Sequence, residues 1–331
     1  MIIIQLAGGL GNQMFQYALY LQLKSLGKEV KIDDVTGFIQ DAKRDPVLKS
    51  FGITYERATK KELEQMLDSS LLPWNRVRRK LLGRKKKSYF EEDKRYHPEI
   101  MAWDDIYLEG YWQTEKYFEA VADEVRQAYD TDKLLRYLRD NVMRESSRYS
   151  DELGTGQMTM DDWLSRITST ESVSMHVRRG DYLLPENQEL FGGICTEAYY
   201  KNAMEQMLRE HPDCRFYLFT NDKQWIRERV KEFEGDGVCP SGTGVADTNW
   251  SGRIEVVDPG NRDGYDYAEF VLMSRCRHNI LANSSFSWWA SYLNPNGDKT
   301  ILAPDEWLNG WDCADIYRDD MRKVKGITTH E

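Results

Sequence analysis

The sequence lacks the features of a membrane-spanning or secreted protein. No apolar run approaches the roughly 20 residues that a helix needs to cross a bilayer, and the mean hydropathy is -0.68. The opening residues, MIIIQL, have no basic flank and too short an apolar stretch for a signal peptide. They predict a buried strand instead, and we expect a cytoplasmic protein.

Patterns typical of disulfides, metal sites and nucleic-acid binding are also missing. The five cysteines are odd in number and form no C-x-x-C pair, which argues against a disulfide framework and a thiolate zinc site. The five histidines are scattered, with no H-E-x-x-H motif. Because 45 Lys and Arg stand against 55 Asp and Glu, the molecule as a whole repels a polyanion. We therefore expect no protein-bound metal and no nucleic-acid partner.

What is present is an alternation of strands and helices over 331 residues, a length that predicts two domains. A strand at 2–6, a glycine turn, a helix at 12–26 and a strand at 30–32 form an opening β-α-β unit. The stretch 59–149 is mostly helical and polar. A second alternating region has strands predicted at 172–178, 215–220, 254–257, 279–282 and 300–303.

This pattern predicts an α/β protein built from two doubly wound, Rossmann-like domains. We place an N-terminal domain at 1–160 and a C-terminal domain at 161–331. We expect the two domains to face each other across a cleft that binds the ligand.

The first candidate site is the glycine turn GGLGNQ at 8–13. Glycines in such a turn let backbone N–H groups approach an oxygen-rich ligand at a helix N-terminus. Asp33 and Asp34 end the next strand, where a dinucleotide fold places its ribose-binding acid, so a nicotinamide or flavin enzyme is one alternative. Against it, Met14 replaces the third glycine of G-x-G-x-x-G. A purely structural turn is the other alternative.

The second candidate site is the segment HVRRGDY, at the carboxyl end of the strand 172–178. Strand alternation places His176 and Arg178 on one face and Arg179 on the other. Guanidinium groups bind phosphates in bidentate geometry, which favours phosphate binding by Arg178. For Arg179, a structural ion pair, for example with Asp181 across the turn, is an equal alternative.

Two further strand ends carry polar clusters. Three serines around Phe286 open a predicted helix, where their hydroxyls and free N–H groups would form an anion site. Capping of this helix explains one serine but hardly three. Asn221 and Asp222 follow the strand 215–220, a position suited to a base or a ribose, with capping of the next helix as the alternative.

A basic run lies at 76–87 and consists of Arg76, Arg78, Arg79, Lys80, Arg84, Lys85, Lys86 and Lys87. A solvated helix or loop is the ordinary interpretation of such a run. The alternative is weak contact with an anionic membrane surface, near which each basic residue contributes about 1 kcal/mol.

Together these motifs resemble the α1,2-fucosyltransferases of glycosyltransferase family 11. The resembling segments are QLAGGLGNQMFQYA at 5–18, HVRRGDY at 176–182, FTND at 219–222 and SSFSWW at 284–289, in the family's order. The H-x-R-R-x-D pattern is highly specific and is shared with the related α1,6- and protein O-fucosyltransferases. The resemblance implies a GT-B-like fold, GDP-fucose as the donor substrate, no cofactor and no metal requirement.

The resemblance also implies roles for single residues. It gives contacts with the nucleotide and the β-phosphate to His176 and Arg178, and nucleotide recognition to Asn221 and Asp222. The further donor-binding candidates are Gly8, Gly9, Gly11, Gln13, Arg179, Ser284, Ser285, Phe286 and Ser287. Asp181 is the candidate general base, as the nearest carboxylate, and Asn12 is a candidate for positioning the acceptor.

The expected activity is an inverting, metal-independent galactoside α1,2-fucosyltransferase. It moves L-fucose from GDP-fucose to the 2-hydroxyl of a β-linked galactose on an oligosaccharide or polysaccharide precursor. The charge that grows on the departing GDP falls to Arg178 and the serine helix end. The alternatives are a nucleotide-dependent Rossmann oxidoreductase and a non-catalytic glycan-binding protein that stacks sugars on its 10 Trp and 19 Tyr.

Overall fold

The computed structural model describes residues 1–39, 44–143, 158–235, 252–259 and 265–326. The chain forms two compact units. The first consists of Met1–Asp130 and Trp311–Arg318, and the second of Thr131–Gly310 and Asp319–Glu331. Within the described ranges, no helix is long and apolar enough to span a membrane.

The first unit contains a parallel sheet of four strands in the order β2-β1-β4-β3. Its strands are β1 (Ile2–Gln5), β2 (Val30–Asp33), β3 (Ser88–Phe90) and β4 (Ile106–Glu109). Its helices are α1 (Leu10–Ser25), α2 (Lys60–Met66), α3 (Pro73–Leu82) and α4 (Ala122–Ala128). Because β1 lies inside the sheet, its three isoleucines are fully buried.

The prediction of a mostly helical stretch at 59–149 is wrong where β3 and β4 lie. Strand β4 pairs with β1 in the register Ile2↔Ile106, and β3 pairs with β4. Pairing with distant β1, which local sequence does not reveal, decides their conformation.

Residues 311–318 return to the first unit through Asp315. One carboxylate oxygen of Asp315 accepts hydrogen bonds from the Tyr96 amide at 2.8 Å and lies 3.1 Å from Arg95 Nε. The other accepts from Lys116 Nζ at 2.6 Å. The contacts of Asp315 with these three groups therefore hold the short segment on the first unit.

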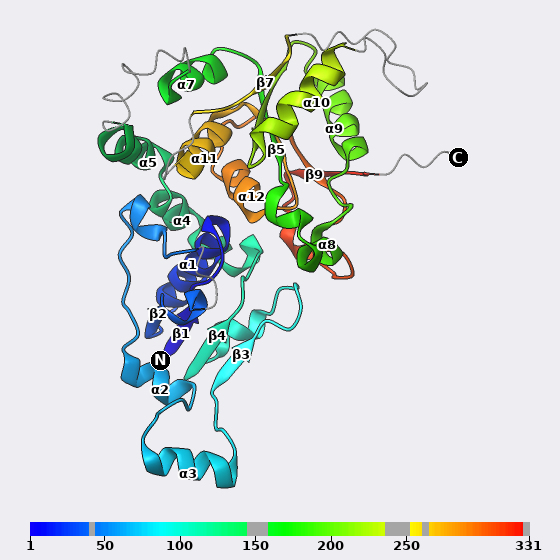
Figure 1. The fold of residues 1–331 in the computed structure, drawn as a ribbon. Helices are drawn as coiled ribbons and strands as arrows, with labels where there is room; N and C mark the ends of the chain where they lie inside the picture. The colour runs from blue at the N-terminus through cyan, green and yellow to red at the C-terminus, as the bar shows by residue number, and fades with distance from the viewer. Residues whose placement is uncertain (40–43, 144–157, 236–251, 260–264, 327–331) are drawn as a thin grey trace. The chain divides into compact units, whose positions relative to one another are not determined.

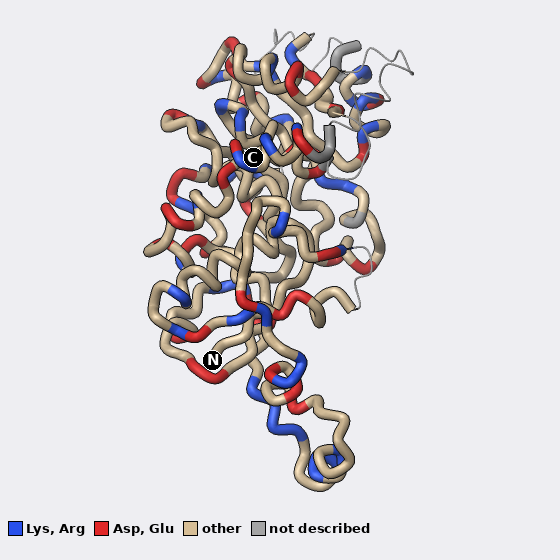
Figure 2. The backbone as a smooth tube through the Cα atoms, turned by 90° about the vertical axis from the view of Figure 1, so that its left-hand side faces the viewer, with Lys and Arg blue, Asp and Glu red and all other residues tan. Residues whose placement is uncertain are grey.

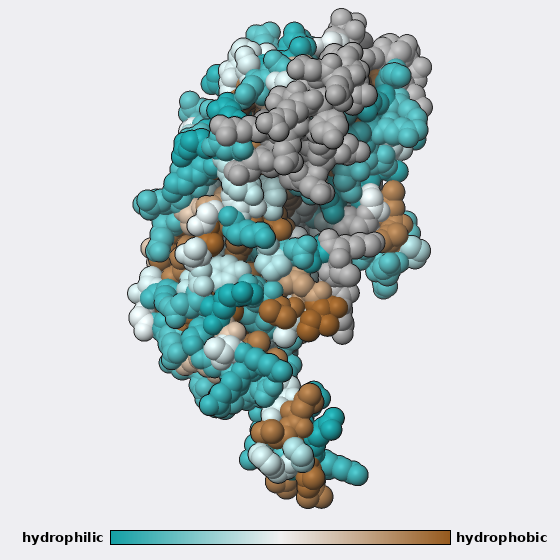
Figure 3. Space-filling view, turned by 60° about the vertical axis from the view of Figure 1, so that its left-hand side comes forward, coloured by the Kyte–Doolittle hydropathy of each residue, from teal (hydrophilic) through white to brown (hydrophobic). Residues whose placement is uncertain are grey.

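Helix α3 projects from the first unit on a hairpin (Figures 1 and 2). It begins at Pro73, ends before Gly83 and contains no buried residue. Figure 2 shows basic residues along this projection, and Figure 3 shows apolar side chains gathered on it.

The second unit contains a parallel sheet of six strands in the order β10-β9-β8-β5-β6-β7. Its strands are β5 (Ser172–Val177), β6 (Arg215–Thr220), β7 (Ile254–Val256), β8 (His278–Ile280), β9 (Ile301–Pro304) and β10 (Met321–Val324). Its helices are α5 (Thr131–Tyr137), α7 (Met160–Thr168), α8 (Pro185–Phe191), α9 (Glu197–Glu210), α10 (Lys223–Gly235), α11 (Tyr265–Arg275) and α12 (Ser285–Tyr292). The α/β class and the two parallel, Rossmann-like sheets are thus confirmed.

The second unit begins earlier than the domain boundary predicted at residue 160. Helix α5 belongs to it because Arg275 of α11 donates hydrogen bonds to the side chains of Thr131 and Asp132, at 2.8 and 2.6 Å. Asp132 is therefore an ion-pair partner of Arg275 inside this unit.

Helices cover both faces of the second sheet. Figure 1 shows α9 and α10 on one side and α11 and α12 on the other. Along β5, Val173, Met175 and Val177 join a core that includes residues of α9 and Ile226 of α10. The intervening Ser174 accepts a hydrogen bond from Asn279, and His176 contacts Phe286 of α12. The alternation predicted for this strand is confirmed.

Candidate active site

The strand order of each sheet marks where a ligand is expected. In parallel α/β sheets, ligands bind beyond the carboxyl ends of the strands at the point where the strand order reverses. In the second unit the chain runs outwards from β5 through β6 to β7, and later from β8 through β9 to β10. The reversal therefore lies between β5 and β8. In the first unit the chain runs outwards from β1 to β2 but inwards from the edge strand β3 to β4, so β1 and β4 are central neighbours without such a reversal.

The reversal in the second unit brings the H-x-R-R and serine motifs together. His176 near the end of β5 and Phe286 in the first turn of α12 have ring centroids 5.7 Å apart. The loops that follow the two strands are joined by a hydrogen bond of 2.9 Å from the Tyr182 hydroxyl to the Asn283 carbonyl. Two motifs that are distant in sequence therefore share one edge of the sheet.

His176 is the most unusual polar residue of this edge. Its side chain is buried, and its Nδ1 has no hydrogen-bond partner among the described residues. Burial, together with the charges of Arg178 and Lys223, lowers the pKa of His176 to about 3. The imidazole is therefore neutral near pH 7, and a buried ring nitrogen without a partner indicates a place where a ligand completes the bonding.

The two adjacent arginines have different surroundings. Arg178 is half-buried, and its guanidinium lies 5.5 Å from the ring centroid of Tyr182, on the loop that follows β5. Arg179 lies 3.3 Å from Asp222 through Nε and stacks on Trp225 at 3.7 Å. The carboxylate that Arg179 meets is thus Asp222 of the next strand end.

Asn221 and Asp222 are engaged within the protein. The Asn221 side-chain oxygen accepts a hydrogen bond from the Arg179 amide at 3.0 Å. Asp222 accepts from the Trp225 amide at 3.2 Å, which caps the start of α10. Gly180 has φ +50°, and a Cβ there would lie 2.2 Å from Asn221 Nδ2. This corner is built for close packing of the two loops.

The serines of α12 have three distinct environments. Ser284 is the N-cap and accepts from the Phe286 amide at 3.3 Å. Ser287 is buried and donates to backbone carbonyls of the preceding turn, while Ser285 is half-buried. Trp288 and Trp289 are fully buried, which makes them core residues. Helix α12 therefore begins at Ser285, directly after its N-cap Ser284.

An acid–base pair that the sequence analysis missed lies near His176. Glu269 of α11 pairs with Lys223 of α10, and burial raises the pKa of Glu269 to about 7. The neighbouring Phe270 packs edge-on against Phe286, with ring centroids 5.3 Å apart. No motif marks these residues, because they lie on two helices and meet only through the fold.

Asp181 can be placed only through its backbone, which lies in the 3₁₀ helix Gly180–Leu183. Its side chain lies outside the part of the chain that the structure describes.

The glycine turn of the first unit is held by glutamines. Gly8 has φ +75°, where a Cβ would approach Asn12 Nδ2 to 2.6 Å. Buried Gln13 donates to the carbonyls of Gly8 and Asp45 and accepts from the Val47 amide. Gln13 thus fixes the turn with all the polar groups of its amide. Gly9 is the N-cap of α1, and Gly11 lies buried in the first turn of that helix.

Asn12 lies in the first turn of α1, beyond the end of β1, and meets the loop that follows β4. Its side-chain oxygen accepts a hydrogen bond of 2.7 Å from Gln113, which follows β4. A Cβ at Gly8 would also lie 3.2 Å from the ring of Tyr111, in the same loop. The orientation of Asn12 is therefore fixed by the loop of the neighbouring strand.

The two acids that favoured an oxidoreductase are already engaged. Asp33 is buried and accepts from the Val35 and Thr36 amides and from the Tyr107 hydroxyl. Asp34 accepts from Tyr55 and Arg57. Neither carboxylate is placed to bind a ribose without losing these bonds.

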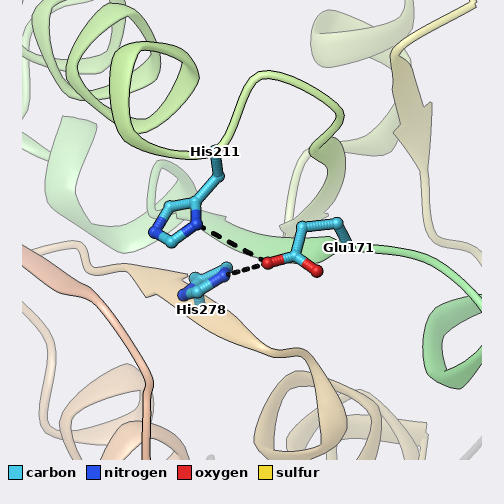
Figure 4. Close-up of side chains that lie close together, drawn as sticks. All are labelled: Glu171, His211 and His278. Atoms are coloured by element: carbon cyan, nitrogen blue, oxygen red, sulfur yellow. Dashed lines mark hydrogen bonds and ion pairs between the residues drawn. The ribbon is translucent and has the colours of Figure 1, made fainter.

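Figure 4 shows Glu171, His211 and His278, whose ligand atoms lie within 4.8 Å of one another. They meet at the starts of the strands, the edge opposite His176. The Thr300 amide donates to His278 Nδ1 at 3.0 Å, so the ring proton is on Nε2, which donates to Glu171 at 2.9 Å. A metal ion at Nε2 would have to displace that proton. We therefore interpret the trio as a hydrogen-bonded clamp.

Comparison with known proteins assigns the chain to a family. The model of Glycosyl transferase family 11 matches residues 137–320, more than half of the chain. The chain belongs to glycosyl transferase family 11. The matched region of this family 11 protein includes β5, β8 and the loops that follow them.

Relatives with assigned names cover most of this family 11 chain. The O-antigen biosynthesis glycosyltransferase WbnK of Escherichia coli is 25% identical over 95% of this chain and 97% of its own. The α-1,2-colitosyltransferase of Escherichia coli is 25% identical, with 93% and 92% covered. Galactoside α-(1,2)-fucosyltransferase 1 of Ateles belzebuth is 26% identical over 89% of this chain and 66% of its own.

Solved structures with some similarity are more remote. A mutant of Arabidopsis thaliana FUT1 in complex with GDP is 13% identical, with TM-score 0.45, and 92% of this chain and 70% of that chain are covered. The ADP-heptose LPS heptosyltransferase II of Escherichia coli is 11% identical, with TM-score 0.42, and 98% and 90% are covered.

The neutral state of His176 predicts a loss of stability in acid. Its pKa is about 3 in the folded protein and about 6.5 in the unfolded chain, so below pH 6.5 only the unfolded chain takes up this proton. This term lowers the free energy of unfolding by about 2 kcal/mol between pH 7 and pH 5. Urea unfolding at the two pH values should show a smaller acid loss in His176→Asn than in the wild type.

The matched control is His97→Asn. Hydrogen bonding to Asp93 raises the pKa of His97, so its removal should not reduce the acid loss. An acid loss in His176→Asn as large as in the wild type would show that His176 is charged in the folded protein.

Proposed function

We propose that this glycosyltransferase moves L-fucose from GDP-fucose to the 2-hydroxyl of a β-linked galactose on an oligosaccharide or polysaccharide precursor, with inversion. The observation that carries the proposal is the arrangement beyond the carboxyl ends of β5 and β8. Arg178, His176 and the capped start of α12 lie together there, and His176 Nδ1 has no hydrogen-bond partner among the described residues. The names of the α-1,2-fucosyl- and α-1,2-colitosyltransferase relatives support this linkage.

Fixed donors stabilise the departing GDP in this proposal. Charge grows on the β-phosphate as the bond to the sugar breaks, and an arginine fork and the positive N-terminal end of a helix stabilise it without reorganisation. Arg178 and the first turn of α12 supply these groups. The proposed reaction therefore requires no metal ion and no other cofactor.

Two roles in the proposal rest on sequence alone. Asp181 is the general base that takes the proton from the acceptor hydroxyl, and Asn12 positions the acceptor. Gln113 supports the second role, because its hydrogen bond holds Asn12 in one orientation.

Glu269 gives the site a means to recognise guanine. Guanine offers two parallel donors, N1–H and the 2-amino group, and a carboxylate accepts both at once. Glu269 is largely buried, the next residue Phe270 packs against Phe286, and Lys223 opposes the protonation of Glu269. We assign guanine recognition to this carboxylate.

The direct test is transfer from GDP-fucose to a β-galactoside such as lactose, in EDTA. We expect a product with fucose linked α1,2 to galactose, identified by NMR, and a turnover that EDTA leaves unchanged. Arg178→Ala is the inactive control. Loss of turnover in EDTA that Mg²⁺ or Mn²⁺ restores would contradict the metal-independent reaction.

Colitose is the competing donor sugar, because one relative is an α-1,2-colitosyltransferase. Colitose is fucose without its 3-hydroxyl, so GDP-colitose in the same assay separates the two candidates. Transfer from GDP-colitose with none from GDP-fucose would replace the proposed donor. Transfer from neither GDP sugar would refute both.

Arg178 and Arg179 should respond differently to the same substitution. Arg178→Lys keeps the charge but loses the fork, so turnover should fall about 10²- to 10³-fold with the melting temperature nearly unchanged. Arg179→Lys loses the stacking on Trp225 and weakens the pair with Asp222, so the melting temperature should fall. Melting curves and GDP-fucose kinetics of both variants check this prediction, which fails if the two patterns are exchanged.

Glu269→Gln should weaken GDP binding about 10- to 100-fold, because a hydrogen bond to a charged group contributes about 1.5–3 kcal/mol. Calorimetric titration with GDP measures the change. Glu255→Gln is the matched control. Glu255 pairs with Arg166 at 2.7 Å and lies on the edge strand β7, which neighbours neither β5 nor β8. Wild-type GDP affinity in Glu269→Gln would exclude this carboxylate from base recognition.

A further inference from the structure

Helix α3 turns its apolar side chains toward solvent. Trp74, Val77 and Leu81 follow the i, i+3, i+7 spacing of one helix face and are 67%, 58% and 76% exposed. Leu71 and Leu82 are exposed beside them. A surface helix ordinarily buries its apolar face against its own protein. An exposed apolar group of this kind marks a surface for interaction.

Polar contacts hold the other side of α3 to the first unit. Arg78 pairs with the carboxylate of Asp68, and Arg79 donates to the carbonyls of Asp68 and Ser70 at 3.1 and 2.6 Å. The Lys85 amide, beyond the end of α3, donates to the same carboxylate at 2.9 Å. Because charged groups anchor the helix, its apolar face points outward in the folded protein.

The hairpin that carries α3 is strongly basic. No Asp or Glu occurs from residue 69 to residue 90, in a chain whose net charge is -10. Within the described ranges, no ion pair is formed by Arg76, Lys80, Arg84 or Lys85. Four cations therefore surround an apolar face, on a projection that is visible in Figures 2 and 3.

We propose that α3 docks the first unit on a bilayer of anionic lipids. Trp74, Val77 and Leu81 enter the boundary between headgroups and acyl chains, and the unpaired cations bind lipid phosphates. Helices that lie in this boundary combine an apolar face, often with Trp, and a basic polar face. The acidic remainder of the molecule is repelled by the same surface, which orients the hairpin toward it.

Other partners fit one half of this surface only. Nucleic acid accounts for the cations and leaves the exposed apolar face without a function. A second copy of the chain covers the apolar face, but brings four further unpaired cations against the first four. An anionic bilayer satisfies both halves, and it does so whichever sugar the enzyme transfers.

The test is co-sedimentation of the full chain with vesicles of phosphatidylcholine, with and without phosphatidylglycerol. We expect binding to the anionic vesicles, weakened by salt. Arg76→Gln with Lys80→Gln should weaken it about 30-fold, since each cation contributes about 1 kcal/mol. Trp74→Ser with Leu81→Ser should weaken it at least tenfold.

The matched control is Arg209→Gln with Lys231→Gln, which removes two exposed cations from α9 and α10 of the second unit and should leave binding unchanged. Melting temperature and turnover on a free oligosaccharide should match the wild type in all three double variants, because α3 contributes no buried residue. This readout separates loss of docking from loss of fold or of activity.

Three results would overturn the proposal. The first is equal binding to neutral and anionic vesicles. The second is undiminished vesicle binding by the folded hairpin variants. The third is a dimer in solution that Trp74→Ser with Leu81→Ser converts to a monomer, with vesicle binding unaltered, since the apolar face would then belong to a second copy.

Discussion

The second unit depends on the alternation of side chains along β5. Every residue of this strand is buried, so each side chain must enter one of two helical layers. Val173, Met175 and Val177 fill the layer beside α9, and Ser174 and His176 enter the layer beside α12. A register shift of one residue would exchange the two sets and bury polar groups in the apolar core. The position of His176 is therefore set by packing, before any ligand is considered.

In the first unit, several polar side chains that sequence alone suggests as ligand-binding groups form hydrogen bonds with backbone groups instead. Gln13 and Gln16 tie the glycine turn to neighbouring loops, and Asp33 organises the turn after β2. Asn12 and Gln113 likewise join the start of α1 to the loop that follows β4. The shape of the turn is therefore fixed by the protein's own hydrogen bonds.

The sequence predicted the strands of the second unit well except for β10, because most of them are rich in apolar residues. The strand predicted at 215–220 coincides with β6, and the strand predicted at 172–178 is β5 with one residue more. β3, β4 and β10 escaped prediction, although the equally short β2, β7 and β8 did not, because pairing with strands distant in sequence decides their conformation.

Part of the candidate site could be predicted in the same way. The sequence predicts His176, Arg178 and the serines as site residues because each lies in a compact motif beside a strand end. Glu269 and Lys223 are separated by many residues on two helices without a motif, and Glu171, His211 and His278 meet only because β5 and β8 are neighbours in the sheet. Pairings of this kind arise from topology, which local spacing does not encode.

The return of residues 311–318 to the first unit affects how the parts of related enzymes can be exchanged. In a chimera with a single join near residue 130, residues 1–130 of the first unit would come from one parent and residues 311–318 of the same unit from the other. Asp315 and the groups that it binds, Arg95, Lys116 and the Tyr96 amide, would then come from different proteins. A swap that respects the folded units needs three joins, after Asp130, after Gly310 and after Arg318. The part that can be exchanged as a folded unit is therefore interrupted in sequence while it is continuous in space.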